Sequence, residues 1–375
     1  MWETLRAHPD VLWSFALALA LVVVLTPVVG RVGRIVGAMD EPGERRRLNV
    51  LPIPRLGGVA LFLGIVVPAL AFLDLSGPYR GILLGAALAT TVGFVDDLRG
   101  LPWWAKLTGQ AATAAVPIGF GVTIDRFTFP PFDPQVLPPW VGIPITFVWI
   151  VAIMNMVNFL DGLDGLAAGI AAIAGTTFSL IALSLGKPEA AVLAAIVAGS
   201  CFGFLRHNFY PARIFMGDSG AFLLGFTLAT LSIQGLLKTA SIVALFFPLL
   251  VLAIPIIDTS FVVARRLKHR EKLYAADQAH LHHRFLRRGF SQRRAALTMY
   301  AWCLTLAAAA LATRFAPPRP GGDWQLGPTL LGGGLGLVAV AFSLYVVYLL
   351  EIVKLTSPRA RRREAAARER ERQSA

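Results

Sequence analysis

Charged residues are scarce in this chain: Asp, Glu, Lys and Arg make up 15% of its 375 residues, against roughly 25% in ordinary soluble domains. The mean hydropathy is +0.65 and 56% of the residues are hydrophobic. This composition excludes a disordered chain and argues against a soluble globule. Only two cysteines are present, Cys201 and Cys303. Both lie in apolar runs without metal-ligand spacing, so we expect buried free thiols.

Acidic residues are the scarcer charge, with 22 Asp and Glu against 35 Lys and Arg, which gives a formal net charge of +13. Such a balance fits either a nucleic-acid-binding protein or a membrane protein with basic cytoplasmic loops. A cleavable signal is not predicted, because the segment before the apolar run 11–29 is nearly neutral and no A-x-A-like site ends that run.

Long apolar stretches account for most of the chain, and a bilayer crossing needs about 20 such residues. Eleven stretches qualify. They cover residues 11–30, 57–75, 80–95, 104–121, 141–157, 166–185, 189–205, 219–236, 241–262, 295–315 and 328–352. The sequence therefore predicts an all-α, polytopic membrane protein with about eleven spans, in which residues 1–355 form a single catalytic membrane domain.

The basic residues orient these spans. If the N-terminus lies outside and the C-terminus in the cytoplasm, 28 of the 35 Lys and Arg residues fall on the inner side and seven on the outer. This is a strong positive-inside pattern. Ten of them lie in the loop 263–294, and residues 356–375 form a basic cytoplasmic tail. We expect that tail to lie against anionic lipid rather than to bind nucleic acid.

Two adjacent carboxylates, Asp96 and Asp97, end the third predicted span. Charged groups at a membrane boundary are costly unless they are solvated, paired or bound to a cation. An acidic turn that ends the helix is one interpretation. The other is a general base or a cation site. Lys106 follows in the same inner loop and is a candidate substrate-binding residue.

A row of amides and carboxylates ends the fifth predicted span. Asn155, Asn158 and Asp161 recur every three residues, so they share one face if the segment is helical. Asp164 continues the spacing, although two glycines allow the chain to leave the helix there. Amide and carboxylate oxygens suit Mg²⁺ and the phosphates it bridges.

Asp218 stands between glycines immediately before the eighth predicted span, in the segment Gly217-Asp218-Ser219-Gly220. A helix N-terminus built from small residues offers backbone N–H groups to an anion, and an adjacent carboxylate can hold a metal that bridges it. Asp218 or Ser219 would also cap the helix well. The two interpretations are compatible.

Three of the six histidines lie within four positions of the loop 263–294, as His280, His282 and His283, followed by Arg284. Zinc is disfavoured because no cysteine accompanies them. A patch that hydrogen-bonds phosphate or sugar fits the neighbouring arginines better. All these polar groups fall on the inner rim, whereas transporters place theirs near the bilayer midplane. The pattern is typical of phosphoryl transfer at the membrane–water interface.

Together these motifs resemble the polyprenyl-phosphate N-acetylhexosamine-1-phosphate transferases, glycosyltransferase family 4. The resemblance extends from Asp40-x-Pro42 through Pro52-x-Pro54-Arg55-x-Gly57-Gly58 to His283. It implies a bacterial inner-membrane enzyme that joins a UDP-N-acetylhexosamine to undecaprenyl phosphate on the cytoplasmic face, releases UMP and uses Mg²⁺ or Mn²⁺. The histidine pattern looks more like the branch that transfers N-acetylglucosamine-1-phosphate. The resemblance also suggests a homodimer.

The resemblance further implies roles for single residues. It assigns the metal to Asp218 with the amide of Asn158, and the acid pair to Asp96 and Asp97, one of which would deprotonate the lipid phosphate. The expected substrate-binding residues are Lys106, Asn155, Asn158, Asp161, Asp164, His280, His282, His283 and Arg284.

Several alternatives stay open at this point. Direct attack by the lipid phosphate is favoured, because a phosphate monoester is already mostly ionised at neutral pH, but a covalent aspartyl intermediate is the alternative. The sugar could instead be phospho-N-acetylmuramoyl-pentapeptide or another N-acetylhexosamine. A lipid-linked-sugar transporter is the competing class.

Overall fold

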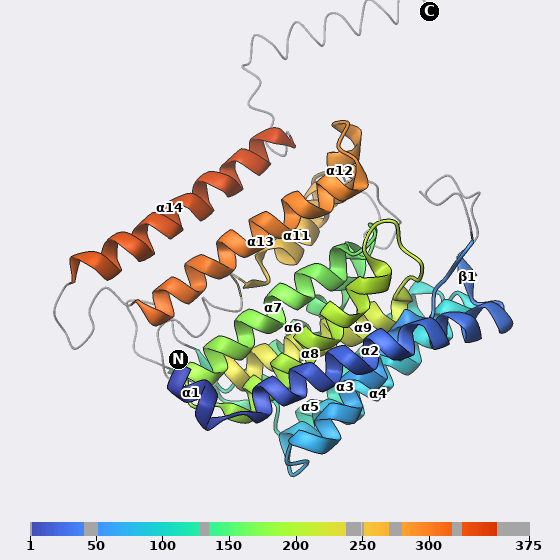
Figure 1. Ribbon diagram of the computed structural model, residues 1–375, viewed down its shortest axis with the longest axis horizontal. Helices are drawn as coiled ribbons and strands as arrows, with labels where there is room; N and C mark the ends of the chain where they lie inside the picture. The colour runs from blue at the N-terminus through green and yellow to red at the C-terminus, as the bar shows by residue number, and fades with distance from the viewer. Residues whose placement is uncertain are drawn as a thin grey trace, which may run out of the picture.

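The computed structural model describes residues 2–40, 52–127, 135–237, 249, 251–269, 280–316 and 325–350. Its helices follow the predicted spans closely (Figure 1). Those that match a predicted span are α2 (Asp10–Ile35), α3 (Gly57–Phe72), α4 (Pro78–Arg99), α5 (Trp103–Gly119), α6 (Pro139–Leu160), α7 (Leu166–Ser184), α8 (Pro188–Asn208), α9 (Gly217–Ser232), α11 (Ala253–His269), α13 (Gln292–Phe315) and α14 (Leu326–Leu349).

Seven of the described helices are long and apolar enough to cross a membrane: α2, α4, α6, α7, α8, α13 and α14. Shorter apolar helices cover Gly57–Phe72 and Ala253–Val263. An all-α, multi-pass membrane protein is therefore confirmed, while the count of eleven spans and the direction of insertion stay predictions. The tail 356–375 lies outside the described residues.

Two short helices and two small sheets complete the described fold. Helix α1 (Trp2–Ala7) precedes α2, α12 (Leu281–Arg287) follows His280, and a π-helical turn, Ile233–Leu237, extends α9. β1 (Met39–Asp40) pairs antiparallel with β2 (Ile53–Pro54), and β3 (Arg126–Phe127) with β4 (Gln135–Val136). The first sheet returns the chain from the end of α2 to the start of α3.

The core is formed by α7, α8 and α9, most of whose residues are buried. Alanine and glycine are frequent there, and small side chains let membrane helices approach closely. α2 packs on α8, and α4 packs on α9. α13 and α14 lie along one side of this bundle (Figure 1). The leucines, valines and tyrosines of α14 are largely exposed, as expected of a helix that faces lipid.

Helices α3, α4 and α9 approach one another closely at two glycines. A Cβ added to Gly93 of α4 would lie 2.4 Å from Ser219 Cα, and one added to Gly58 of α3 would lie 2.2 Å from the backbone nitrogen of Gly220. Real Cβ contacts are essentially never that short, so glycine is required at both positions. This close approach brings the end of α4 and the start of α3 against the N-terminus of α9, where Asp218 lies.

Candidate active site

Asp97 lies at the centre of this junction and is fully hydrogen-bonded. Its Oδ1 accepts from Arg55 Nε at 3.3 Å, Arg55 Nη2 at 3.1 Å and the backbone nitrogen of Asp218 at 2.9 Å. Its Oδ2 accepts from the backbone nitrogen of Ser219 at 3.0 Å. The carboxylate thus occupies the N-terminus of α9, the favourable end of a helix dipole for a negative charge.

Gly217 makes that contact possible. Its φ is +68°, and a Cβ at this position would lie 2.4 Å from Asp97 Oδ2. The left-handed backbone and the absent side chain are both needed. The Gly217-Asp218-Ser219-Gly220 motif is therefore explained first by the anion-binding helix end it forms, and the anion in this structure is the side chain of Asp97.

Lys106 holds the other two carboxylates. Its ammonium pairs with Asp218 Oδ2 at 3.1 Å and with Asp96 Oδ2. Asp96 Oδ1 accepts from the backbone nitrogen of Leu101 at 2.6 Å, and Asp218 Oδ1 accepts from Asn158 Nδ2 at 2.9 Å. Asp96 is almost fully buried, whereas the Asp218 side chain is 24% exposed. Asp218 is thus the more accessible of the two.

The remaining amide of the predicted row is engaged elsewhere. Asn155 exchanges two hydrogen bonds with Gln110, one from Gln110 Nε2 at 3.2 Å and one to Gln110 Oε1 at 2.7 Å. Gln110 is 1% exposed and lies one helical turn after Lys106 on α5. Gln110 was not among the predicted site residues, although its position four residues after Lys106 places both on one face of α5.

The two aspartates of the α6–α7 turn, Asp161 and Asp164, lie in different surroundings. α6 ends at Leu160, so Asp161 lies just beyond the helix rather than on its face. Burial, together with the charges of Asp218, Asp97 and Asp164, raises the pKa of Asp161 to about 8. Asp164 Oδ2 accepts from the backbone nitrogen of Ala212 at 2.9 Å and so ties this turn to the segment that leads into Asp218.

The histidines pack against the same turn. His280 stacks near Phe159, with ring centroids 5.2 Å apart, and parallel to His282 at 5.8 Å. His282 is 2% exposed, and a Cβ on Gly162 would lie 2.2 Å from its Nε2. Its Nδ1 has no hydrogen-bond partner among the described residues. Burial, with the charges of His283 and His280, lowers the pKa of His282 well below its usual range, so it is neutral at pH 7.

Asp258 of α11 orients this cluster and was not among the predicted site residues. It is fully buried, and its Oδ2 lies 2.9 Å from His280 Nδ1. A carboxylate only accepts, so Nδ1 carries the proton and Nε2 faces away from Asp258. Its Oδ1 accepts from the backbone nitrogen of Leu281 at 2.7 Å, which also caps α12. An acidic residue inside an otherwise apolar helix was the available sequence signal.

Arg284, by contrast, contacts hydrophobic and backbone groups. Its guanidinium lies 4.3 Å from the ring centroid of Phe261, and its Nη1 donates to the carbonyl of Leu350 at 3.2 Å. Leu350 ends α14, where a cation is favourable. His283 lies 4.2 Å from His282, centroid to centroid.

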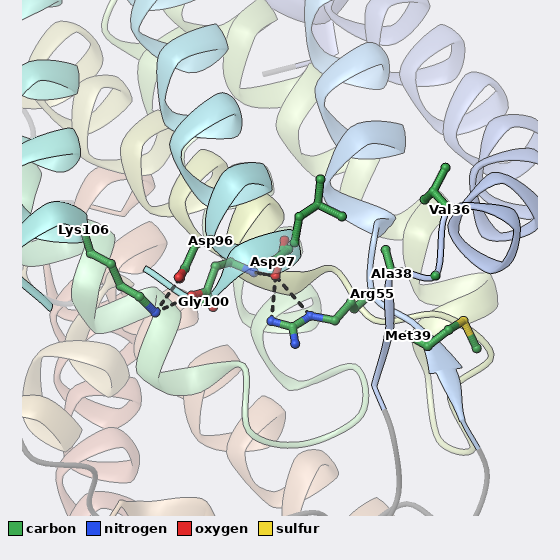
Figure 2. Close-up of a pocket in the computed structure, with 11 residues that line it drawn as sticks. Val36, Ala38, Met39, Arg55, Asp96, Asp97, Gly100 and Lys106 are labelled. Carbon is green, nitrogen blue, oxygen red and sulfur yellow. Dashed lines mark hydrogen bonds and ion pairs between the residues drawn. The ribbon is translucent and has the colours of Figure 1, made fainter. Parts of the chain in front are cut away.

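A polar cavity of about 390 Å³ opens beside the three carboxylates. Figure 2 shows Lys106 and Arg55 approaching the Asp96–Asp97 pair from opposite sides. The residues that line the cavity come from the ends of α2 and α4, from the starts of α5 and α9 and from the segment just before α3: Val36, Gly37, Ala38, Met39, Arg55, Asp96, Asp97, Leu98, Gly100, Lys106 and Asp218. Arg55 was not among the predicted site residues.

The donor set fits a hard divalent cation. Among the described residues, no group of three or more His, Cys, Asp and Glu side chains is arranged to hold a metal ion by itself. Asp218 and Asp96 nevertheless already share one positive charge, that of Lys106, and the amide of Asn158 lies beside Asp218. Oxygen donors of this kind, with substrate phosphate completing the shell, are typical of Mg²⁺ sites.

The chain is similar in sequence to a known family and to several known proteins. Residues 79–236 match the family model described as glycosyl transferase family 4. The chain is 35% identical to a probable undecaprenyl-phosphate N-acetylglucosaminyl 1-phosphate transferase of Bacillus subtilis over 76% of this chain and 80% of the relative. It is 34% identical to a decaprenyl-phosphate N-acetylglucosaminephosphotransferase of Mycobacterium leprae, over 82% and 85%. A phospho-N-acetylmuramoyl-pentapeptide-transferase of Desulforudis audaxviator is 31% identical, over 80% and 95%.

Proposed function

The chain belongs to glycosyl transferase family 4, and from that premise we propose that it transfers N-acetylglucosamine-1-phosphate from UDP-N-acetylglucosamine to undecaprenyl phosphate, with release of UMP. The observation that carries the proposal is the cluster of Asp96, Asp97 and Asp218 around Lys106 and Arg55, in a cavity at one end of a membrane helix bundle. Relatives that cover most of this chain carry the names of such transferases.

The reaction joins two anions. An oxygen of the lipid phosphate attacks the phosphorus that bears the sugar, a new P–O bond forms, and the P–O bond to UMP breaks. A bound Mg²⁺ would neutralise the charge of the diphosphate, and Asp218 and Asn158 are the residues we expect to hold it. Lys106 and Arg55 offset the repulsion between the two phosphates.

The different hydrogen bonds of Asp96 and Asp97 suggest different roles for the two residues. Asp97 accepts four hydrogen bonds from Arg55 and the start of α9, so its oxygens are occupied and its work is to fix the helix end and Arg55. Asp96 accepts one backbone hydrogen bond and pairs with Lys106. We therefore assign to Asp96 any residual proton of the lipid phosphate. Little is left to remove, because the second pKa of a phosphate monoester is about 6.

The sugar nucleotide fits the opposite side of Asp218. There Asn158 contacts Asp218, and the turn with Asp161 and Gly162 contacts the buried His282. The unpartnered Nδ1 of His282 is a neutral group that can hydrogen-bond a sugar hydroxyl, an amide or a phosphate oxygen. Asp258 orients the adjacent His280. Gln110 positions Asn155. Asp164 positions the loop before Asp218 through its hydrogen bond with Ala212.

The wider setting of the enzyme is part of the same proposal. Eleven spans, an outer N-terminus and an active site at the cytoplasmic face of the bacterial inner membrane account for the charge asymmetry along the chain. Mn²⁺ is an alternative to Mg²⁺, and a homodimer is expected from the family resemblance. The product is then the first lipid-linked intermediate of a cell-envelope polysaccharide.

A second candidate keeps the chemistry and changes the sugar. The similarity to a phospho-N-acetylmuramoyl-pentapeptide-transferase covers 80% of this chain at 31% identity, so that donor is the alternative to test. A transporter of lipid-linked sugars is the remaining alternative. Its acidic residues would line a crossing path, whereas Asp96, Asp97 and Asp218 meet at one end of the helices.

Release of UMP tests the proposal. The purified full chain is mixed with undecaprenyl phosphate, Mg²⁺ and one donor at a time: UDP-N-acetylglucosamine, UDP-N-acetylgalactosamine or UDP-N-acetylmuramoyl-pentapeptide. We expect UMP from UDP-N-acetylglucosamine and none with an Asp218→Asn variant. A faster reaction with the pentapeptide donor would support the second candidate. Folded protein that releases no UMP from any of the three donors would contradict the transferase assignment.

A further inference from the structure

Tyr300 is a polar residue within the largely apolar helix α13, outside the cluster of carboxylates. α13 packs along α7 at one side of the bundle (Figure 1). The hydroxyl of Tyr300 donates to the backbone carbonyl of Gly165 at 2.5 Å. Gly165 ends the α6–α7 turn and is the N-cap of α7. This hydrogen bond therefore joins α13 to the turn that carries Asp161 and Asp164.

The surface of α7 is shaped to receive the tyrosine ring. A Cβ added to Gly169 would lie 2.1 Å from Tyr300 Cζ, so any side chain at that position would displace the ring. A Cβ added to Gly165 would lie 3.1 Å from the hydroxyl oxygen, and the φ of this residue is +75°, which favours glycine. The two glycines are one helical turn apart and leave the space that Tyr300 fills.

Gly165 is held at both of its backbone polar groups. Its N–H donates to Asn208 Oδ1 at 3.1 Å, while its carbonyl accepts from the tyrosine. Asn208 is 1% exposed, and its Nδ2 donates to the carbonyl of Ile214 at 2.9 Å. Ile214 lies in the loop that leads into Asp218. Tyr300 therefore begins a chain of hydrogen bonds that runs from α13 through the α6–α7 turn to this loop.

The same turn also contacts α12, which precedes α13 in the chain. His282 of α12 packs against Gly162 of the turn. α12 and α13 are joined by a short segment in which Phe290 packs edge to face on Phe285, with ring centroids 5.3 Å apart. α12 and α13 thus hold the turn at two points, through His282 and through Tyr300. One contact alone would leave the turn free to pivot, whereas two fix its orientation.

We propose that Tyr300 is a positioning residue for the donor side of the site: its hydroxyl holds the Gly165 carbonyl and so fixes the α6–α7 turn relative to His282. The inference rests on the proposed function for the identity of the donor, and it deepens that function by adding a residue of α13. Tyr300 does not line the cavity beside the carboxylates, so we expect it to affect the reaction only through the turn.

Amide hydrogen exchange tests this positioning without turnover. Tyr300→Phe removes the hydroxyl and keeps the ring over Gly169. The amides of residues 161–166 should exchange about fivefold faster in this variant than in the unmodified chain, which corresponds to one net hydrogen bond. Ser343→Ala is the matched control, because Ser343 Oγ accepts a hydrogen bond from Trp302 of α13 at 2.8 Å on the side of α14. Unchanged exchange at 161–166 in Tyr300→Phe, or equal acceleration in Ser343→Ala, would overturn the proposal.

The two KM values test the effect on the reaction. Tyr300→Phe should raise the KM for UDP-N-acetylglucosamine about fivefold, because the donor side is less well ordered, and leave the KM for undecaprenyl phosphate unchanged. Ser343→Ala should change neither. A purely structural role for the tyrosine would lower the melting temperature and the yield of active enzyme and change neither KM, so that result would also overturn the proposal.

Gly169→Ala provides a second variant, because it displaces the ring and keeps the hydroxyl. It should raise the donor KM to a similar extent, and combining it with Tyr300→Phe should add little, since both changes break one contact. Fully additive effects would contradict the proposal.

The exchange measurement keeps this inference separate from the proposed function. If the unmodified chain releases no UMP from any UDP-sugar while Tyr300→Phe speeds exchange at residues 161–166, the proposed function has failed and the positioning of the turn stands. If the chain releases UMP and the variant changes neither the exchange nor the donor KM, the positioning role has failed and the proposed function stands.

Discussion

Arg55 and Asp97 are 42 residues apart in the sequence and form a two-donor ion pair in which Arg55 Nε and Nη2 both donate to Asp97 Oδ1. The same carboxylate also accepts hydrogen bonds from the backbone N–H groups of Asp218 and Ser219 in the first turn of α9. One side chain therefore joins the start of α3, the end of α4 and the start of α9. Arg55 is held by this pair with its side chain still accessible from the cavity.

Replacing Asp97 should destabilise the protein. In Asp97→Asn an amide N–H₂ group would face backbone N–H donors, and Arg55 would lose its counter-charge. Breaking a buried ion pair on one side costs about 3–5 kcal/mol. We expect a clear loss of thermal stability in detergent, together with lost activity. Asp74→Asn is the control, because Asp74 is exposed and accepts hydrogen bonds from the nearby Ser76. An unchanged melting temperature for Asp97→Asn would contradict the structural role.

Replacing Asp96 should reduce activity strongly and thermal stability only slightly. Asp96→Asn keeps an oxygen for the Leu101 backbone donor and leaves Lys106 paired with Asp218. We expect a small change in melting temperature and a loss of kcat of about 100-fold or more, the usual effect of removing a charged group that acts on the reacting atoms. A variant that melts much earlier yet turns over normally would contradict the division of roles between the two aspartates.

The Asp218→Asn variant tests the proposed cation site directly. Asp218 is the carboxylate that lies between Lys106 and Asn158, and an amide there removes one negative charge at constant shape. We expect turnover to fall by about 100-fold or more, with no recovery in excess Mg²⁺. Binding of Mn²⁺, followed by its electron paramagnetic resonance signal, should weaken in parallel. Normal Mn²⁺ binding by the variant would place the metal elsewhere.

The sequence predicted the helices and their order well, because runs of apolar residues reflect the lipid surroundings directly. It was weaker where a helix leaves the apolar region. In the described residues, the predicted span 241–262 corresponds to Ala253–His269. The helix continues past the predicted end through two arginines and a lysine, and a search for apolar stretches stops before such charged residues. The polar cluster at one end of the bundle was foreseen from positions along the chain alone.

The partner of each polar group could not be read from the sequence. Asn155, Asn158 and Asp161 have regular spacing, yet Asn155 pairs with Gln110, Asn158 with Asp218, and Asp161 lies beyond the helix end. Spacing reports the face of one helix, whereas partners depend on how neighbouring helices cross. Glycines at the crossings, such as Gly93 and Gly217, decide those distances, and nothing in a single sequence states what each glycine touches.

The pKa of His282 predicts a pH dependence of stability. The folded state keeps this buried imidazole neutral, since its pKa is lowered by burial and by its histidine neighbours, while the unfolded chain binds a proton near the ordinary value of about 6.5. Its contribution to stability is complete above that pH and is lost as the pH falls below it. The wild type should therefore lose more thermal stability between pH 7.5 and about 5 than His282→Gln. Equal losses would contradict a buried neutral imidazole. His8→Gln is the control.

Gly162 is the point where the α6–α7 turn packs against His282 in the proposed donor site, because a Cβ there would lie 2.2 Å from His282 Nε2. Gly162→Ala should push the imidazole away from the α6–α7 turn and weaken the sugar-nucleotide side of the site. We expect the KM for UDP-N-acetylglucosamine to rise by about tenfold, the cost of one lost hydrogen bond of about 1.4 kcal/mol, with the KM for undecaprenyl phosphate unchanged. Gly119→Ala is the matched control, since no atom lies within 4 Å of a Cβ at that helical position. Equal increases in both KM values would move His282 out of the donor site, because a contact that serves one substrate alone cannot raise both.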